Sequence, residues 1–169
     1  GEFAATLLDT GQSVALVART ARHALLYDVG EHWGSGGAVS EAVIVPALRA
    51  LHVRRLDRLL VPRLDADRSA GLAVLDASMD VAIWQAGGTE ARRPPEFTGC
   101  PRGERWTWDG VSFENLVADE CVLRIVAAPS VDAAAGGASL LVAGELDRGG
   151  QQRLLDAGLA SQDAVILPR

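Results

Sequence analysis

The first third of the chain consists of short apolar runs separated by turn residues. Runs of this kind, bounded by glycine and polar residues, are typical of β-strands. A hairpin and a third strand are therefore predicted, in this order: residues 5–11, 13–19 and 23–30. Apolar positions then recur at helical spacing from Val43 to Leu51, behind Ser40, a suitable N-cap residue. Within this predicted helix, Pro46 indicates a short first turn or a kink.

The rest of the chain alternates strand-like and helix-like segments. A buried strand over residues 56–62 leads directly into a polar loop over 63–71, and helices are predicted over 70–78 and 148–159. Residues 86–104 are rich in glycine, proline and arginine without periodicity, which predicts an irregular excursion. The remaining strands, two of them joined by an Asp-Gly hairpin turn at 109–110, are predicted over residues 81–84, 105–110, 111–117, 121–127, 138–144 and 163–168. This order indicates an α/β or α+β layered domain.

Length and charge narrow the function classes. The chain of 169 residues is long enough for one domain with a substantial core, predicted over residues 4–169, and the opening Gly-Glu-Phe at 1–3 is interpreted as a cloning remnant. The net charge of −6 argues against strong nonspecific nucleic-acid binding, although it is compatible with a local arginine patch. All 16 lysine-plus-arginine residues are arginine, which excludes Schiff-base chemistry and a P-loop lysine.

Cysteines, strand-end aspartates and the chain end give weaker signals. Residue types alone leave Cys100 and Cys121 equally open to a disulfide or to two buried free thiols. Asp9 and Asp28, at the ends of predicted strands, are open to two interpretations, as groups that support a metal site from behind its ligands or as turn caps, and turn caps are the preferred one. The chain stops directly after an apolar run, which predicts that it ends inside a domain of a longer protein. No apolar run is long enough to span a bilayer, so membrane segments would belong to the rest of that protein.

The loop over residues 63–71 carries the strongest candidate chemistry. Asp65 and Asp67 stand two positions apart, and Arg63 and Arg68 flank them. Aspartates this close together commonly share a metal cation, whereas here the chain itself supplies positive charge. A solvated loop of mixed charge is the simpler interpretation of the same residues.

The order of the segments resembles a known family. It is similar to the metallo-β-lactamase-like domain of the ComEC-type competence proteins, polytopic channels that internalise DNA in natural transformation. The resemblance covers nearly the whole chain and implies an αββα sandwich, truncated at its C-terminus, with the family's disulfide between Cys100 and Cys121. The segments that carry it are "LLDTGQSVALVAR", "LLYDVG", "VIVPALRALHVRRLDRLLVPRLDADRSAGL", "WTWDGVSF", "CVLRI", "LLVAGEL" and "AVILPR".

The family's metal motif is degenerate in this sequence. Where the family has H-x-D-x-D-H, this chain has "RLDADR", which keeps both aspartates and replaces both histidines by arginine. The later T-G-D reads "AGE", and the closing P-H-H-G reads only "PR". The resemblance thus implies that three carboxylates are remnants of the metal ligands: Asp65, Asp67 and Glu145. It also implies that three arginines supply positive charge in place of the metals: Arg63, Arg68 and Arg169.

Arginine does not replace histidine as a metal ligand, because guanidinium has no acceptor and stays protonated. We therefore expect Asp65 and Asp67 to pair with Arg63 and Arg68, and Glu145 to be available to one of these arginines. No cofactor is expected, although three carboxylates can hold a weakly bound, water-rich Mg²⁺ or Mn²⁺ ion. Zinc or manganese, with Asp67 as the catalytic residue, is expected only if this copy is active.

The resemblance implies two alternative functions. In the first, the chain is a metal-free, inactive domain of a DNA uptake protein and acts as a scaffold or a weak contact for DNA or competence partners. It would then be a monomer beside the transmembrane channel of the same protein, on the periplasmic face of the inner membrane. In the second, it is an active metal-dependent nuclease or phosphodiesterase that degrades the strand that is not imported. An unrelated globular domain remains a third interpretation.

Overall fold

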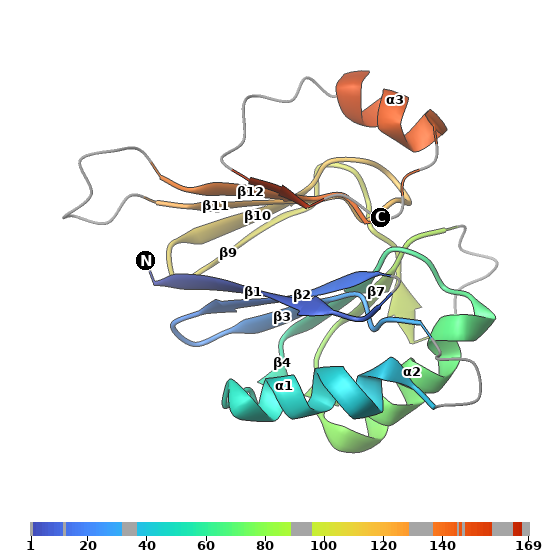
Figure 1. The fold of residues 1–169 in the computed structure, drawn as a ribbon. Helices are drawn as coiled ribbons and strands as arrows, with labels where there is room; N and C mark the ends of the chain where they lie inside the picture. Colours follow the sequence, from blue (N-terminus) through green and yellow to red (C-terminus); the bar gives the residue numbers. More distant parts are fainter. Residues whose placement is uncertain are drawn as a thin grey trace.

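The protein folds as an αββα sandwich. Its structure, a computed structural model, describes residues 2–11, 13–31, 37–88, 96–128, 137–144, 146, 148–156 and 164–166. Two β-sheets lie face to face. Helices α1 (Val45–Ala50) and α2 (Ala66–Ser78) cover the outer face of one sheet, and α3 (Arg148–Asp156) lies over the other (Figure 1). The layered α/β fold predicted from the sequence is therefore confirmed.

The first sheet is built from the first half of the chain. Its strands, in spatial order, are β1 (Phe3–Asp9), β2 (Val14–Thr20), β3 (Ala24–Tyr27), β5 (Arg58–Val61), β7 (Trp84–Ala86) and β8 (Phe97–Thr98). The first three pair antiparallel, as the predicted hairpin and third strand require, and the others follow in parallel. β8 corrects the predicted irregular excursion, because two of its residues pair with β7; residues 89–95 of that excursion lie outside the described residues.

The second sheet is built from the second half of the chain. Its strands, in spatial order, are β13 (Ala164–Ile166), β12 (Ser139–Val142), β11 (Leu123–Ala127), β10 (Val111–Asn115) and β9 (Arg105–Trp108). They pair antiparallel except for β12 and β13, which are parallel. A separate parallel pair joins β4 (Arg55–Leu56) to β6 (Asp80–Val81). Within the described residues, no helix is long and apolar enough to cross a membrane.

The helix predicted after Ser40 forms, but its start differs from the prediction. A π-helical turn, η1 (Ser40–Ile44), precedes α1, and Pro46, which has no backbone N–H to donate, lies in the first turn of α1. Ser40 is not the N-cap. Its buried Oγ instead donates a hydrogen bond to the carbonyl oxygen of Val29, 2.9 Å away.

Strands β3 and β5 are buried on both faces and so connect two cores. Leu26 and Leu59 belong to the core between the first sheet and the helices. Leu25 and Leu60, one residue away on each strand, belong to the core between the two sheets. Because side chains alternate along a strand, the continuous apolar runs of these segments fill both layers at once. The helices and the second sheet are therefore both held against the same central strands.

A disulfide joins Cys100 to Cys121, as the resemblance implied. Both residues are fully buried in the core between the sheets. Cys100 follows β8 of the first sheet, and Cys121 precedes β11 of the second, so the bond ties the two sheets together. Tyr27 adds a second link, because its hydroxyl donates a hydrogen bond to the carbonyl oxygen of Cys121, 2.8 Å away.

A polar network also crosses the interface between the sheets. Arg58 of the first sheet donates from Nη1 to Gln85 at 2.8 Å and to Glu104 at 3.0 Å, and its guanidinium lies 3.7 Å from the ring centroid of Trp106. Gln85 and Asn115 both donate to the second carboxylate oxygen of Glu104. The network pairs most of its buried polar atoms, but Nε of Arg58, Nε1 of Trp106 and Oδ1 of Asn115 are buried without a hydrogen-bond partner among the described residues.

Asp109 links the turns at one end of the sandwich. It begins the predicted Asp-Gly turn between β9 and β10 with a φ of 50°, a left-handed conformation that aspartate tolerates. Its Oδ2 accepts hydrogen bonds from Thr20 at 2.7 Å, from the Arg22 backbone at 2.9 Å and from His23 at 3.0 Å. The turn of the second sheet is thereby fastened to the β2–β3 turn of the first.

Acid should weaken this link. The hydrogen bond from His23, followed by the one from Thr20, holds the pKa of Asp109 well below its usual value of 3.8. The carboxylate therefore stabilises the fold fully above pH 3.8, and this contribution is lost as the pH falls through the folded-state pKa. We expect the unfolding free energy of the wild type to fall more steeply with acid than that of Asp109→Asn, in urea titrations from about pH 5 to 2. If the unfolding free energies of the two proteins fall with equal slope as the pH is lowered, the Asp109 carboxylate does not contribute to stability.

Candidate functional site

The degenerate metal motif lies where β5 of the first sheet ends and α2 begins. Asp65 is the N-cap of α2 and has an extended backbone with φ −140° and ψ 176°. Its Oδ1 accepts a hydrogen bond from the backbone N–H of Arg68, 3.1 Å away, as a capping aspartate does. The cap therefore fixes the loop and brings the side chains of Asp65 and Arg68 together.

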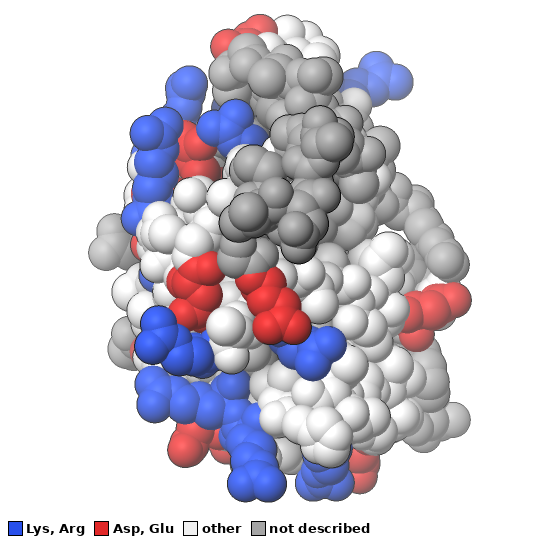
Figure 2. Space-filling model, turned by 90° about the vertical axis from the view of Figure 1, so that its left-hand side faces the viewer, with Lys and Arg blue, Asp and Glu red and all other residues white. Residues whose placement is uncertain are grey.

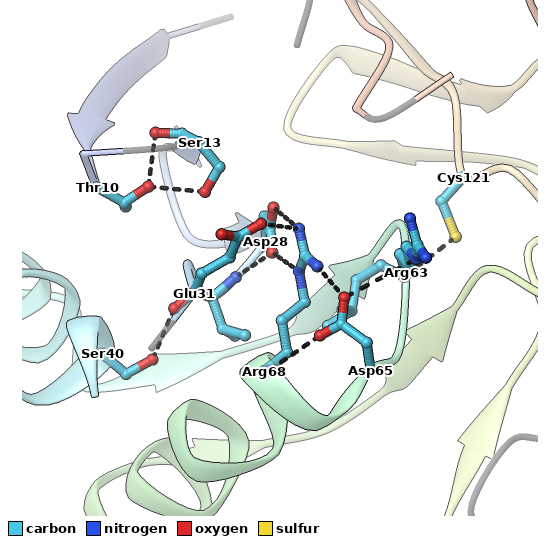
Figure 3. Close-up of polar contacts among 11 residues, drawn as sticks. Thr10, Ser13, Asp28, Glu31, Ser40, Arg63, Asp65, Arg68 and Cys121 are labelled. Carbon is cyan, nitrogen blue, oxygen red and sulfur yellow. Dashed lines mark hydrogen bonds and ion pairs between the residues drawn. The ribbon is translucent and has the colours of Figure 1, made fainter. Parts of the chain in front are cut away.

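Arg68 is the centre of the site and is fully buried (Figure 3). Its Nη1 donates to Oδ2 of Asp65 at 2.7 Å. Its Nε and Nη2 donate to the two carboxylate oxygens of Asp28 at 3.0 and 3.3 Å, a bidentate contact. Glu31 adds a fourth charge, with Oε1 at 3.9 Å from Nη2. One guanidinium thus meets three carboxylates.

Asp28 is the partner that the sequence did not reveal. Directly after β3, it takes a left-handed conformation with φ 66°, and its Oδ1 accepts a hydrogen bond from the next backbone N–H, Val29, at 2.7 Å. The predicted turn cap is thus present, but the same 3% exposed residue also pairs with Arg68. No local pattern connects these residues, which lie 40 positions apart, and only the parallel pairing of β3 with β5 brings them together. The predicted cap at Asp9 is confirmed by its bond from Gly11.

The other predicted site residues are peripheral or lie outside the described residues. The side chain of Arg63 is 67% exposed, with Nε 3.8 Å from Oδ2 of Asp65. Asp67 is exposed in the first turn of α2, where a negative charge favours the helix dipole. The predicted pairing of Asp67 with an arginine is not found within the described part of the chain, whereas the pairing of Asp65 is. Glu145 and Arg169 lie outside the described residues.

Glycine lets α2 approach the first sheet closely behind the site. A Cβ atom added to Gly71 would lie 2.7 Å from Oγ of Ser40 and 3.4 Å from the carbonyl oxygen of Val29. Because a side chain would push the helix away, the "SAG" after the motif keeps Arg68 within reach of Asp28. The helix position and the ion pair therefore depend on each other.

The residues at this site do not fit a metal ion. Guanidinium offers donors only, and the buried Arg68 places a fixed positive charge among the carboxylates. Across the described ranges, no group of three or more His, Cys, Asp or Glu residues is arranged to hold a metal. His23 lies beside Asp109, far along the sequence from this loop, and His32 lies outside the described residues.

Sequence comparison finds curated relatives of this chain, among them a competence protein, although no family profile matches the chain. Competence protein ComA of Neisseria gonorrhoeae is 36% identical over an alignment of 166 residues that covers 91% of this chain and 21% of that protein. Recombination protein 2 of Haemophilus influenzae is 30% identical over 121 residues, 69% of this chain and 15% of that protein. The chain thus spans about a fifth or less of the length of these relatives.

Solved structures with a similar fold include metallo-β-lactamases. MEM-A1, a subclass B3 enzyme from a soil metagenome library, matches with a TM-score of 0.60 and 11% identity over 97% of this chain and 74% of its own. A metallo-β-lactamase from Cronobacter sakazakii with an HARLDQ motif matches with a TM-score of 0.56 and 14% identity over 86% of this chain and 62% of its own. At these identities the likeness shows the fold alone. Together with the competence relatives, it identifies the chain as a metallo-β-lactamase-like domain of the ComEC-type competence protein family.

Proposed function

We propose that this domain serves DNA uptake without metal-dependent hydrolysis, as a scaffold or a weak contact surface in its parent protein. The observation that carries the proposal is the buried guanidinium of Arg68 between Asp28 and Asp65. A two-metal hydrolase holds divalent cations with lone pairs that point inward and uses them to lower the pKa of a bound water. Here the carboxylates are occupied by a cation that belongs to the chain.

The ion pair is costly to replace by a metal. A carboxylate as buried as Asp28 requires a partner, and the bidentate guanidinium supplies one with directed hydrogen bonds. To bind there, a divalent cation would have to displace the guanidinium and leave it charged in a buried place. Arg68 thus preserves the shape of the loop while it removes the electrostatic demand for a metal.

The relatives support a biological setting for this domain. Since competence proteins are similar to this chain, we place the domain beside the transmembrane channel of its own parent protein. We further propose a monomeric domain on the periplasmic face of the inner membrane, which touches DNA weakly or through competence partners. The buried disulfide supports this location, because disulfides persist in oxidising compartments.

One observation favours the alternative, an active nuclease for the strand that is not imported. Asp67 is exposed at the start of α2, and Asp65 is 28% exposed, so solvent and a cation reach both carboxylates. Glu145, at the position of another family ligand, lies outside the described residues. Such a site would be a water-rich Mg²⁺ or Mn²⁺ site at the rim, outside the buried pair.

A DNA cleavage assay separates the two functions. The domain is incubated with single-stranded and double-stranded DNA in the presence of Mg²⁺, Mn²⁺ or Zn²⁺, beside an Asp65→Ala/Asp67→Ala control. We expect the same background cleavage from both proteins, because neither provides a metal-bound nucleophile. Metal-dependent cleavage by the wild type that disappears in the double variant would establish the nuclease and refute the proposal.

A further inference from the structure

A pocket of about 510 Å³ lies at the other end of the first sheet from Arg68. Residues 19–24 and residues 51–55 line it, from the turn after β2 and from the segment between α1 and β4. Ala24, the first residue of β3, lines this pocket, whereas Asp28 directly follows the last residue of the same strand. The pocket is therefore separate from the degenerate metal motif.

Positive charge dominates the lining of this pocket. Its charged and titratable residues are Arg19, Arg22, Arg54, Arg55, His23, His52 and one carboxylate, Asp57. Figure 2 views the molecule from the end where these turns lie and shows basic side chains gathered in its lower half, on the side of the helices. The whole chain has a net charge of −6, so the positive charge of this pocket is a local feature of opposite sign.

Part of this charge has no carboxylate partner among the described residues. Arg22 pairs with Asp109, and Arg55 lies 3.9 Å from Asp57. Among the described residues, no carboxylate pairs with Arg19 or Arg54. Arg19 donates from Nη1 to a backbone carbonyl at 3.2 Å, but its Nε is buried and no described group accepts from it.

These features call for an anionic ligand with several acceptor oxygens. A bound anion would pair with the arginine charges that have no carboxylate partner among the described residues. Guanidinium groups present paired N–H donors that match phosphate oxygens, and four arginines from two segments line this pocket. A phosphate group fits this donor set better than a carboxylate, since it accepts hydrogen bonds on more sides.

We propose that this arginine pocket binds backbone phosphate of single-stranded nucleic acid. An aromatic surface favours nucleic acid over other phosphate carriers. The half-buried ring of His23, which lines the pocket, stacks on Trp108 with centroids 5.0 Å apart and an interplanar angle of 7°. Basic grooves beside stacked rings are typical of proteins that bind single strands. The choice of nucleic acid rests on the proposed role in DNA uptake, whereas the anion site rests on the arginines alone.

Fluorescence anisotropy with a labelled oligothymidylate at low salt tests the proposal. Arg54→Gln/Arg55→Gln removes two exposed charges from the pocket, and Arg102→Gln/Arg148→Gln removes two exposed charges elsewhere. We expect the pocket variant to weaken binding about tenfold and to reduce the slope of log K against log salt by about 1.4, while the control variant stays near the wild type. Equal weakening in both variants, or in neither, would refute a pocket-specific site.

Two further measurements distinguish the sources of phosphate. In NMR titrations with the oligonucleotide, amide shifts of residues 19–24 and 51–55 should move and saturate, and shifts that move elsewhere would contradict the site. Binding of phosphatidylglycerol vesicles and of free inorganic phosphate is measured in parallel. Binding to either of these without binding to the oligonucleotide would overturn the assignment to nucleic acid. DNA cleavage in the preceding assay would refute the metal-free function and leave this pocket unaffected.

Discussion

Arg68→Met is expected to lower the free energy of unfolding by about 3–5 kcal/mol. The substitution removes a fully buried guanidinium and leaves Asp28, 3% exposed, as a charge without its bidentate partner. Breaking a buried pair on one side is costly because the remaining charge keeps its desolvation penalty. Urea denaturation followed by circular dichroism measures the change, with the assumption of two-state unfolding checked by a second probe.

Two variants make this prediction specific to the buried pair. Arg63→Met removes a 67% exposed arginine from the same motif and should change stability by less than about 1 kcal/mol. Asp28→Asn combined with Arg68→Met should cost clearly less than the sum of the two single changes, because no isolated charge remains. If Arg68→Met and Arg63→Met have equal, small effects, the buried pair does not hold the loop.

Loss of the disulfide should cost roughly 3 kcal/mol, by the chain-entropy relation for a loop of this size. Cys100 and Cys121 are 21 positions apart, and removing their bond frees that segment in the unfolded state. Cys100→Ala/Cys121→Ala tests this by urea denaturation. Part of the loss will reflect the two buried sulfur atoms, so the wild type with and without reductant provides the matched comparison.

Reduction should therefore lower the unfolding midpoint of the wild type and leave that of the double-alanine variant unchanged. A reductant effect of equal size in both proteins would arise from something other than this bond. If the bond is shown to be reduced and the midpoint of the wild type is unchanged, the disulfide does not contribute to stability.

The fold was predictable where local patterns suffice. The apolar runs that became β3 and β5 are buried on both faces, and continuous apolar segments predict this burial. The Asp109-Gly110 turn was likewise predictable, because this pair adopts left-handed conformations readily. β8 was missed because two residues in a glycine- and proline-rich stretch carry no period. Its pairing depends on the neighbouring strand rather than on its own sequence.

The sites were predictable only in part, because their residues come from distant segments. The arginine-aspartate pairing in "RLDADR" was foreseen for Asp65, since Asp65 and Arg68 lie only three positions apart in the sequence. The stronger partner, Asp28, comes from another strand end, and nothing in its own surroundings distinguishes it from a turn cap. The arginine pocket likewise combines residues 19–24 with residues 51–55, which are distant in the sequence. The negative net charge of the chain gave no indication of this basic site.

The central claim is that Arg68 stands in the place of a metal ion. Its most direct test is metal content by mass spectrometry, after the wild type and Asp65→Ala/Asp67→Ala are soaked in Zn²⁺ and Mn²⁺ and desalted. We predict that the wild type retains no more metal than the double variant. Stoichiometric metal in the wild type that the double variant loses would contradict the claim.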